Sequence, residues 1–254
     1  MSKNFFKLIK TDLFAAKTRD PAARSYMEII LTYSGFHALF IHRLCHLLWK
    51  LKLKLLARFI ANLSRIITSI EIHPAVEIDQ GFFIDHGSGL VIGETTTIGK
   101  DVTVYQQVTL GGLSPSIDSF SQRNVKRHPT IGDNVIIGSG AQVLGPILVG
   151  KNSRVGTNAV VLKNVPENFT YVGIPARRVE SETIKDETFE AYGISGGKID
   201  DPNKKSILAL FNEIHILSEK INILKSKVSN FPLSDKKINL GKKEKQKYKG
   251  KIEK

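Results

Sequence analysis

Cysteine, tryptophan and long apolar runs are scarce in this sequence. Its 254 residues include one cysteine, Cys45, and one tryptophan. A lone cysteine permits no internal disulfide and favours a reducing compartment, so we expect a cytoplasmic protein. No stretch approaches the roughly 18 consecutive apolar residues of a membrane span. Lysines interrupt the apolar residues of the N-terminal MSKNFFKLIK, so we expect neither a signal peptide nor a membrane span.

Acidic residues are in the minority, with 24 Asp and Glu against 37 Lys and Arg, for a net charge of +13. An excess of this size ordinarily indicates a nucleic-acid partner. Residues 235–254, however, hold nine lysines and three acidic residues, so this tail alone contributes +6 (9 − 3). Because nearly half of the excess lies in one terminal run, we expect a disordered, solvating tail and no nucleic-acid partner.

An aliphatic residue recurs at every sixth position through most of residues 72–166, usually followed by a small or acidic residue. This period fits neither a helix nor an alternating strand, and it is typical of a parallel β-helix. Each hexapeptide forms one flat side with its aliphatic residue inward, and three sides complete a coil of about 18 residues. The repeat positions are Ile72, Ile78, Ile84 and Leu90, then after a two-residue slip Ile92, Ile98, Val104 and Leu110, and after a break Ile131, Ile137, Val143, Val149, Val155 and Val161.

The spacing of apolar residues predicts helices in the segments before and after the repeat. Residues 1–70 predict a cap of helices at 4–16, 22–32, 36–50 and 55–68, with Gly35 as an interruption. The last helix carries an apolar face that must be buried against the solenoid end or a neighbouring subunit. The alternative for the basic, leucine-rich HRLCHLLWKLKLKLLARF is a position on a membrane surface. We therefore expect a cap (1–70), a β-helix domain (71–180) and a third region (181–254) of connector, helix and basic tail.

Residues 203–229 carry apolar residues at alternating spacings of three and four, which is the seam of a coiled coil. Isoleucine at one seam position and leucine at the other favours two strands in parallel coiled coils, whereas a trimeric β-helix would bring three chain ends together. A single helix packed against the solenoid is the alternative. The seam residues are Ile207, Leu210, Ile214, Leu217, Ile221, Leu224 and Val228.

Six short motifs stand in a fixed order through the repeat. They are EIHPA (71–75), DHGSG (85–89), VIGET (91–95), YQQVTLGG (105–112), KRHPTIGD (126–133) and VGIPAR (172–177), with RDPAARS (19–25) in the cap. In this order the sequence resembles the short form of bacterial and plant serine O-acetyltransferases over roughly residues 10–180. The resemblance implies a left-handed β-helix, a homotrimer or dimer of trimers, and transfer of acetyl from acetyl-CoA to L-serine, the first step of cysteine synthesis from serine.

Such a transfer needs a base for the serine hydroxyl, and imidazole has a suitable pKa near pH 7. We assign this role to His86, at a repeat corner beside two glycines that leave room for substrate. A carboxylate on its other ring nitrogen would fix the tautomer. Glu71 precedes His86 by slightly less than one regular coil, so we expect it to approach His86 across stacked coils. Many members of the family carry aspartate at this position.

The resemblance also implies binding residues for both substrates. Asp20 and Asp85 match residues that bind the amine and hydroxyl of serine, while Arg127 and His128 match those that hold its carboxylate, a task that suits the arginine fork. Arg127 and His128 stand at the base of a polar loop over residues 113–127, which has no hexapeptide period and is expected to leave the prism. For acetyl-CoA the candidates are small residues beside the pantetheine arm and cations for the phosphates: Gly111, Gly112, Gly140, Ala141, Lys163, Arg177 and Arg178.

Acetyl-CoA is thus expected as a co-substrate, with no permanently bound cofactor and no metal. Two alternatives stay open. A sugar or antibiotic O-acetyltransferase would use a comparable histidine, and a zinc hydro-lyase of the carbonic-anhydrase β-helix type would use His73, His86 and His128, converging between subunits. The resemblance further implies O-acetylserine sulfhydrylase as a partner, which takes up a C-terminal isoleucine. This sequence instead ends in KIEK.

Overall fold

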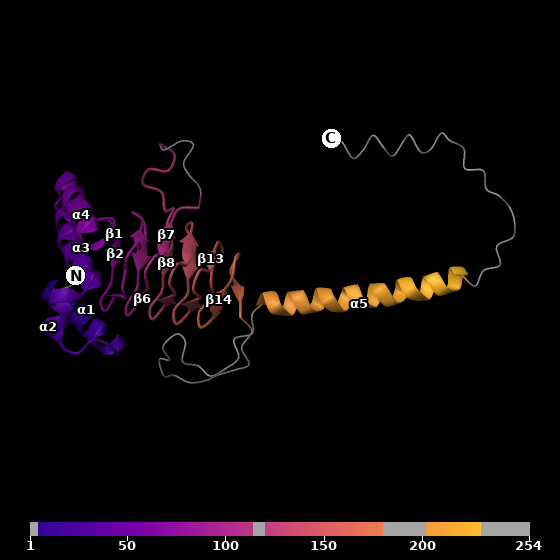
Figure 1. Ribbon diagram of the computed structural model, residues 1–254. Coiled ribbons are helices and arrows are strands. Elements are labelled where there is room, and N and C mark those ends of the chain that lie inside the picture. The colour runs from indigo at the N-terminus through magenta and orange to yellow at the C-terminus, as the bar shows by residue number, and fades with distance from the viewer. Residues whose placement is uncertain (1–4, 114–119, 180–201, 230–254) are drawn as a thin grey trace. The chain divides into compact units, whose positions relative to one another are not determined.

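The structure, a computed structural model, describes residues 5–113, 120–179 and 202–229 (Figure 1). The chain forms two compact units, Met1–Lys205 and Ser206–Lys254. Within the described ranges, the first contains four helices followed by fifteen short strands, and the second contains most of one long helix, α5 (Pro202–Ser229). None of the helices in the described ranges is long and apolar enough to cross a membrane.

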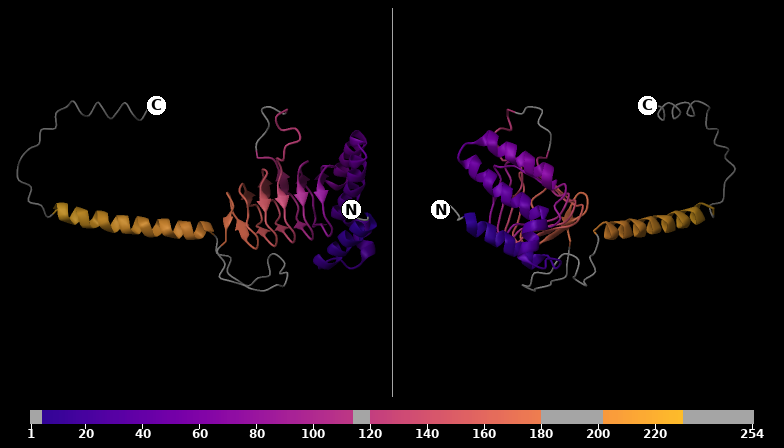
Figure 2. Two further views of the ribbon diagram at one scale, coloured as in Figure 1. Left: turned by 180° about the vertical axis from the view of Figure 1, so that it is seen from behind. Right: turned by 60° about the vertical axis from the view of Figure 1, so that its left-hand side comes forward.

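The strands form three sheets that the chain visits in rotation. Sheet A has the order β1-β4-β7-β10-β13, sheet B β11-β8-β5-β2 and sheet C β15-β14-β12-β9-β6-β3. Neighbours are parallel except β14 and β15, so successive turns of the chain stack into a three-sided prism (Figures 1 and 2). The strands are β1 Glu71–Ile72, β2 Glu77–Ile78, β3 Phe83–Ile84, β4 Val91–Ile92, β5 Thr97–Ile98, β6 Thr103–Val104, β7 Thr109–Gly111, β8 Thr130–Ile131, β9 Ile136–Ile137, β10 Gln142–Leu144, β11 Leu148–Val149, β12 Arg154–Val155, β13 Val160–Val161, β14 Thr170–Val172 and β15 Arg177–Arg178.

The hexapeptide period predicts the interior correctly. All fourteen repeat positions are at most 8% exposed, and they form one core along the prism. The corners are shaped by residues in the left-handed backbone region, often asparagine, which tolerates that conformation. Asn134 donates to Asn152 and Asn152 donates to Asn168, both at 3.0 Å, so one corner carries a ladder of side-chain amides.

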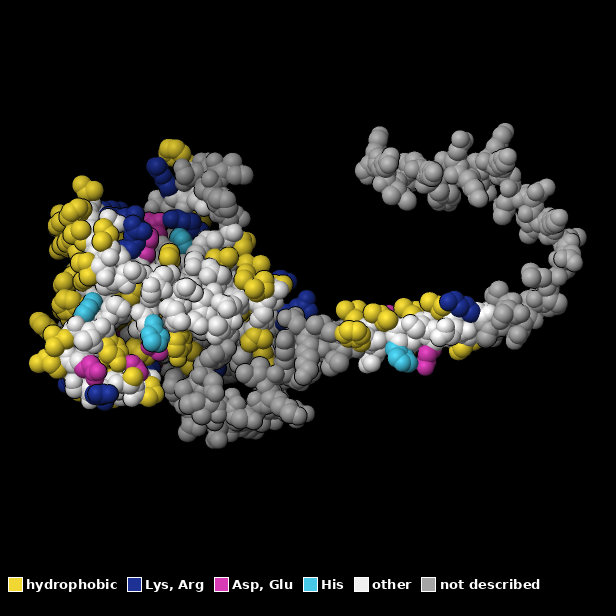
Figure 3. All heavy atoms as spheres, viewed as in Figure 1, with side chains coloured by type: hydrophobic (Ala, Val, Ile, Leu, Met, Phe, Trp, Pro, Cys, Tyr) yellow, Lys and Arg dark blue, Asp and Glu magenta, His cyan; other side chains and the backbone are white. Residues whose placement is uncertain are grey.

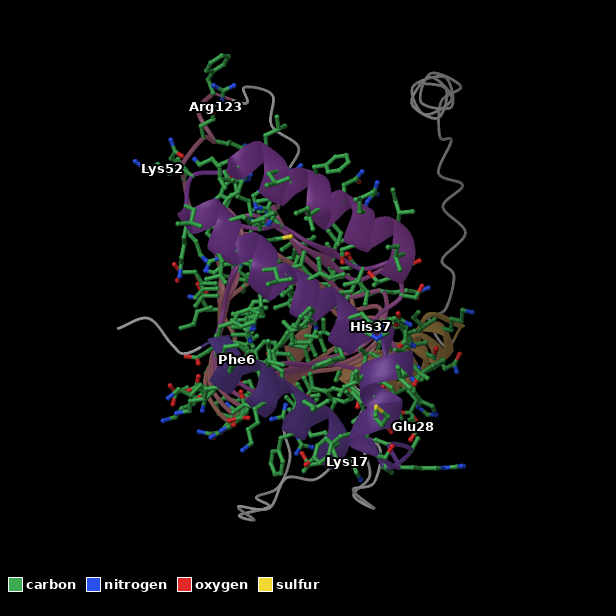
Figure 4. All side chains as sticks on the ribbon, turned by 90° about the vertical axis from the view of Figure 1, so that its left-hand side faces the viewer. Phe6, Lys17, Glu28, His37, Lys52 and Arg123 are labelled. Carbon is green, nitrogen blue, oxygen red and sulfur yellow. The ribbon has the colours of Figure 1, made fainter. Side chains whose placement is uncertain are left out.

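Two irregularities interrupt the repeat between β1 and β13. Consecutive strands begin six residues apart except at two places: Phe83 and Val91 are eight apart, and Thr109 and Thr130 are 21 apart. The first irregularity adds two residues to the corner that contains His86. The second is the polar loop, in which Arg123 stacks on the ring of Phe120 at 4.2 Å and projects away from the prism (Figure 4). Residues 114–119 of this loop lie outside the described residues.

The helices are α1 (Phe5–Arg19), α2 (Tyr26–Thr32), α3 (Ser34–Lys50) and α4 (Lys54–Thr68). The second helix begins at Tyr26, four residues later than expected, where the Ser25 side chain accepts the Glu28 N–H at 3.1 Å. The interpretation of Gly35 as an interruption is wrong, because Gly35 lies in the first turn of α3. A Cβ atom there would stand 2.2 Å from the carbonyl oxygen of Ile84, so glycine allows α3 to approach β3 closely.

The helices close the first end of the prism through buried polar contacts. Arg43 binds both carboxylate oxygens of Asp12, with a shortest distance of 3.0 Å, and donates to the backbone oxygens of Ile78 and Asp79. Asp12 also accepts the Gly81 N–H at 2.9 Å. The ion pair therefore connects α1 and α3 to the corner after β2.

The apolar face expected on the fourth helix is not buried within the chain. Leu55, Phe59 and Ile67 are 86%, 59% and 77% exposed, while the buried residues of α4 are Ala57, Ser64 and Thr68. Apolar side chains accordingly gather on the outer side of the helical end of the molecule (Figure 3). Burial against the solenoid end is thus wrong for this face, and burial against a neighbouring subunit stays a prediction.

Candidate active site

His86 lies at the corner between β3 of sheet C and β4 of sheet A. Its φ is +58°, the left-handed conformation that other corner residues such as Gln107 and Asn134 share. Ser34 at the start of α3 donates its hydroxyl to the His86 carbonyl oxygen at 3.1 Å. The imidazole is 76% exposed, and its Nε2 stands 3.8 Å from Oδ1 of Asp85, which is only 21% exposed. The base candidate is therefore accessible and has a carboxylate beside it.

A second carboxylate, Asp20, lies near this corner. Tyr33 donates its hydroxyl to Oδ2 of Asp20 at 2.6 Å, and the Ala22 N–H donates to Oδ1 at 2.7 Å. Burial, followed by the bond to Asp20, raises the pKa of Tyr33 to about 12, so it remains a donor. Burial and the charge of Asp20 raise the pKa of Asp85, although His86 opposes the shift. Asp20, Tyr33, Asp85 and His86 are called the His86 corner below.

Arg127 and His128 lie at a different corner, between sheets A and B. Arg127 Nη2 binds Oε2 of Glu94 at 2.5 Å, and Nη1 donates to the Gln122 oxygen at 3.1 Å. Burial favours the neutral form of Glu94, but the bond from Arg127 and the positive charges around it bring its pKa below the usual value. Glu94, Thr95, Arg127 and His128 are called the Arg127 corner.

His128 is held tightly at this corner. Its Nδ1 accepts the Thr95 N–H at 3.1 Å, while the Thr95 hydroxyl oxygen accepts the backbone N–H groups of Arg127 and His128, each at 3.1 Å. The imidazole ring fills the space over Gly93, where a Cβ atom would come within 2.2 Å of its Nε2. Burial, and then the charge of Arg127, lowers the pKa of His128 to about 4.

Glu71 does not lie where its sequence distance from His86 suggested. In sheet A, Glu71 pairs with Val91, which follows the His86 corner in the chain. No hydrogen bond or ion pair joins Glu71 to His86 in the described part of the chain, and Oε2 of Glu71 is 3.9 Å from Nη1 of Arg65. Glu71 lines a hollow of about 260 Å³ between α4 and β1, together with Arg58, Arg65 and His73.

The candidate acetyl-CoA residues divide between corners. Gly140, with φ of +70°, lies between sheets C and A, as His86 does. Gly111 ends β7, and Gly112 and Lys163 follow β7 and β13 of sheet A, all on the side of the Arg127 corner. Arg177 and Arg178 are exposed in β15 of sheet C. Ala141 is completely buried in the prism core, so contact of its backbone with the pantetheine arm stays a prediction.

The two corners flank sheet A on opposite edges. The His86 corner lies where the chain enters sheet A, and the Arg127 corner lies where it passes from sheet A to sheet B. The width of one sheet therefore separates the two groups of serine-binding candidates, and a single chain does not bring them together. The same separation holds for His86 and the other two histidines of the zinc alternative, since His73 also lies between sheets A and B.

Several contacts of these corners were missed by sequence reasoning. Glu94 and Thr95 stand within the VIGET motif and could have been found there, as polar residues directly after a buried strand. Tyr33 and Ser34 lie in the helical cap, and no periodicity links them to His86.

Comparison with known proteins identifies the general class of protein to which the chain belongs. Residues 128–163 match the family model "Bacterial transferase hexapeptide (six repeats)", in agreement with the stacked hexapeptide sides and with a histidine and carboxylates at one corner. The chain is thus a hexapeptide-repeat transferase. Residues 1–40 match the model "Serine acetyltransferase, N-terminal".

Individual relatives show to which family of hexapeptide-repeat transferases the chain belongs. The chain is 53% identical to the serine acetyltransferase of Bacillus pumilus over 175 residues, covering 69% of this chain and 77% of the relative. It therefore belongs to the serine acetyltransferase family. Among solved structures it is similar to a serine acetyltransferase of Neisseria gonorrhoeae in complex with serine (38% identity, TM-score 0.64, 69% of each chain). It is also similar to one of Brucella abortus in complex with coenzyme A (41% identity, TM-score 0.63, 67% of this chain and 66% of that one).

Proposed function

We propose that this chain transfers the acetyl group of acetyl-CoA to the hydroxyl of L-serine, which yields O-acetyl-L-serine and CoA and begins cysteine synthesis from serine. The observation that carries the proposal is the His86 corner, where an exposed imidazole stands 3.8 Å from the Asp85 carboxylate. The serine and coenzyme A bound by the two similar structures support the choice of substrates.

His86 acts as the general base in this proposal. As the serine oxygen bonds to the thioester carbonyl carbon, its proton passes to the imidazole. The tetrahedral intermediate then collapses, the carbon–sulfur bond breaks, and the departing CoA sulfur takes the proton back from the imidazolium. The carboxylates beside His86 stabilise its protonated form between the two steps. Each turnover therefore leaves the histidine as it began.

The polar groups of the two corners bind the ends of serine. Asp20 and Asp85 suit the ammonium group because both are carboxylates near the base. Arg127 and His128 suit the carboxylate. The bonds of Arg127 to Glu94 and Gln122 use two of its five N–H donors, so donors remain for a ligand. The lowered pKa of His128 keeps its ring neutral at pH 7, with an N–H to donate.

We further propose that the prism is a left-handed β-helix and that three copies assemble around a threefold axis, as a trimer or a dimer of trimers. The separation of the two corners by sheet A supports this assembly. A neighbour's His86 corner set against the Arg127 corner of this chain would complete a serine site between subunits. Glu71, the proposed orienting carboxylate, is exposed on sheet A between the two corners.

The proposed path of acetyl-CoA follows the same edges of the prism. Gly140 lies on the same edge as His86 in a later coil, while Gly111 and Lys163 lie in later coils on the opposite edge of sheet A. In a trimer these two edges would meet between neighbouring subunits, which suits an extended ligand whose thioester lies at His86. The phosphates would then lie near Lys163, Arg177 and Arg178. The Arg178 guanidinium already stacks on the Phe169 ring at 3.7 Å.

The remaining assignments are also proposals. We infer a cytoplasmic enzyme with a cap (1–70), a catalytic domain (71–180) and a C-terminal region (181–254), which the break between compact units near residue 205 supports in part. Binding to O-acetylserine sulfhydrylase depends on the family resemblance alone, and residues 230–254, where it would occur, lie outside the described residues.

The test is the release of CoA thiol from acetyl-CoA by the purified full chain. We expect release that depends on L-serine and saturates with it, with O-acetyl-L-serine as the product by mass spectrometry. Cys45 adds little background to a thiol assay, because it is only 1% exposed. Release driven by a sugar or antibiotic acceptor, with none from L-serine, would overturn the proposal.

A further inference from the structure

The long helix α5 carries an apolar seam open to solvent. Its described seam residues, Leu210, Ile214, Leu217, Ile221 and Leu224, are 51–60% exposed. Side chains at this spacing form the contact face of a coiled coil, and the seam from Ile207 to Val228 runs through about three heptads of this 28-residue helix. Another face of α5 is polar, where His215 Nδ1 lies 3.9 Å from Oε1 of Glu219, one turn apart. Phe211, Ile216 and Ile223 are also exposed on α5 outside the seam, but the seam residues are the ones that alternate by three and four, which is the spacing that suits another helix.

The charges beside the seam argue against a parallel pair. With Ile214 and Ile221 at position a of the heptad, Lys220 is at g and Lys225 at e. In a parallel coiled coil each g residue meets the e residue five positions later on the partner. Lys220 would then face Lys225 of the second copy, twice in a dimer and three times in a trimer. Glu213, the acidic g residue, would face the uncharged Ser218.

An antiparallel pair gives the opposite result. In this arrangement Ile214 of each helix lies level with Leu217 of the other, and g residues meet g residues. Glu213 of each helix therefore faces Lys220 of the other, which gives two pairs of opposite charges. A shift of one heptad would instead set the two Lys220 side chains against each other.

We propose that α5 binds the α5 of a second copy of this chain in antiparallel orientation, with Ile214 of each helix opposite Leu217 of the other. A threefold rotation cannot set a helix antiparallel to its own copy. If the prism is a trimer, as proposed above, the antiparallel pair must therefore join two trimers. The pairing itself depends only on the seam and charges of α5, so it can fail while the proposed enzyme activity stands.

Thiol cross-linking in the full-length protein tests the orientation. Cys45 is buried, so an introduced cysteine is the only exposed thiol. In the antiparallel register Leu210 lies opposite Ile221 of the second copy, whereas in a parallel pair Leu210 faces Leu210. Chains with Leu210→Cys and Ile221→Cys, distinguished by tag length and produced together, should give a mixed cross-link with a short thiol reagent. Leu210→Cys alone should give almost none.

The control is Asn212→Cys on the outer face of the same helix, which should not cross-link. Serine-dependent acetyl transfer by each variant confirms that it is folded. Cross-linking of Leu210→Cys to itself, or the absence of any mixed cross-link, would overturn the proposal, since the first means a parallel pair and the second an unpaired helix or one with another partner.

Charge exchange provides an independent check. Lys220→Glu should weaken the antiparallel pair several-fold, because Glu213 would then face a glutamate, and adding Glu213→Lys should restore it. In a parallel pair Lys220→Glu would meet Lys225 and strengthen association. Sedimentation of the full-length variants over a range of concentrations distinguishes the two outcomes, and stronger association of the single variant would contradict the antiparallel arrangement.

Discussion

The Nδ1 atom of His128 accepts the backbone N–H of Thr95 at 3.1 Å and lies 2.8 Å from the Thr95 hydroxyl oxygen. A ring nitrogen that accepts an N–H carries no proton of its own, so the proton of neutral His128 belongs on Nε2. Thr95 thereby fixes both the tautomer and the orientation of the ring. His128 can then donate a hydrogen bond to a substrate oxygen, but it is a poor base.

We expect Thr95→Val to weaken serine binding. The change removes the hydroxyl that organises Arg127 and His128 but keeps the shape of the side chain. Since one hydrogen bond contributes about 1 kcal/mol, the KM for L-serine should rise about fivefold, with little change in the KM for acetyl-CoA. Thr95→Ser retains the hydroxyl and should behave as the parent does. Steady-state kinetics with each substrate varied check this, and an unchanged KM for serine would show that Thr95 has no role in binding.

His86→Ala should reduce acetyl transfer by the factor of about 10² to 10⁴ that a lost general base commonly costs. The fold should persist, because the imidazole is largely exposed. Turnover and circular dichroism together check both parts. His215→Ala, an exposed histidine on α5, is the matched control and should keep full activity. Full activity of His86→Ala itself would refute the assignment of the base.

Glu71→Gln should slow turnover more than it weakens serine binding, since it preserves size and removes the charge that would stabilise the imidazolium. Separate measurement of kcat and KM decides the role. Glu77→Gln is a close control, because Glu77 begins β2 as Glu71 begins β1, and both are exposed. A rise in KM alone would make Glu71 a binding residue.

The stability of the protein should fall as the pH drops from about 6.5 to 4. Burial and nearby cations lower the pKa of both His73 and His128 to about 4, whereas an unfolded histidine titrates near 6.5. Between these values the two histidines bind more protons in the unfolded chain than in the folded one, so their titration favours unfolding in acid. Asp12, whose pKa burial raises to about 6, opposes this change below pH 6 but is one group against two. Melting temperatures across this range test the expectation. His128→Asn should show a shallower dependence, and an identical slope would mean that His128 titrates normally in the folded protein.

Truncation after Gly197 should leave acetyl transfer intact, because the candidate residues all precede that point. It should lower the melting temperature of the oligomer in a concentration-dependent way, since the seam of α5 joins copies in either orientation. Scanning calorimetry over a hundredfold range of protein concentration is the measurement. Identical melting of the full and truncated chains at every concentration would make α5 dispensable for assembly.

The prism interior could be predicted from sequence because a single rule sets it. An inward side chain recurs with each flat side, so the period alone identifies Ile72 and the thirteen equivalent residues. Gly35 shows where such reasoning ends. Its role depends on the approach of α3 to the backbone of Ile84, a contact between distant parts of the chain. The face of α4 shows the same limit, because amphipathicity predicts that a face is covered but not what covers it.

The candidate site was predicted in identity but not in arrangement. The motifs name His86, Arg127 and His128, yet the period does not reveal that these residues occupy different corners. Glu71 was expected beside His86 because their separation in the sequence is close to one regular coil. The enlarged corner lengthens the first coil by two residues, so the residue level with Glu71 is Val91. A small insertion at one corner is enough to displace a predicted contact.

Beyond that insertion the coils stack regularly, so the distance along the prism from the His86 corner depends on the number of coils. Beyond the His86 corner, in-register neighbours such as Val91 and Thr109 are one regular coil apart, and each further coil advances the stack by about 4.8 Å. A coil added or deleted far from the corner would leave the reacting end of a bound molecule in place and move only the distant end. The number of coils beyond His86 therefore sets the length of an extended ligand that can contact the edge of the prism at both of its ends.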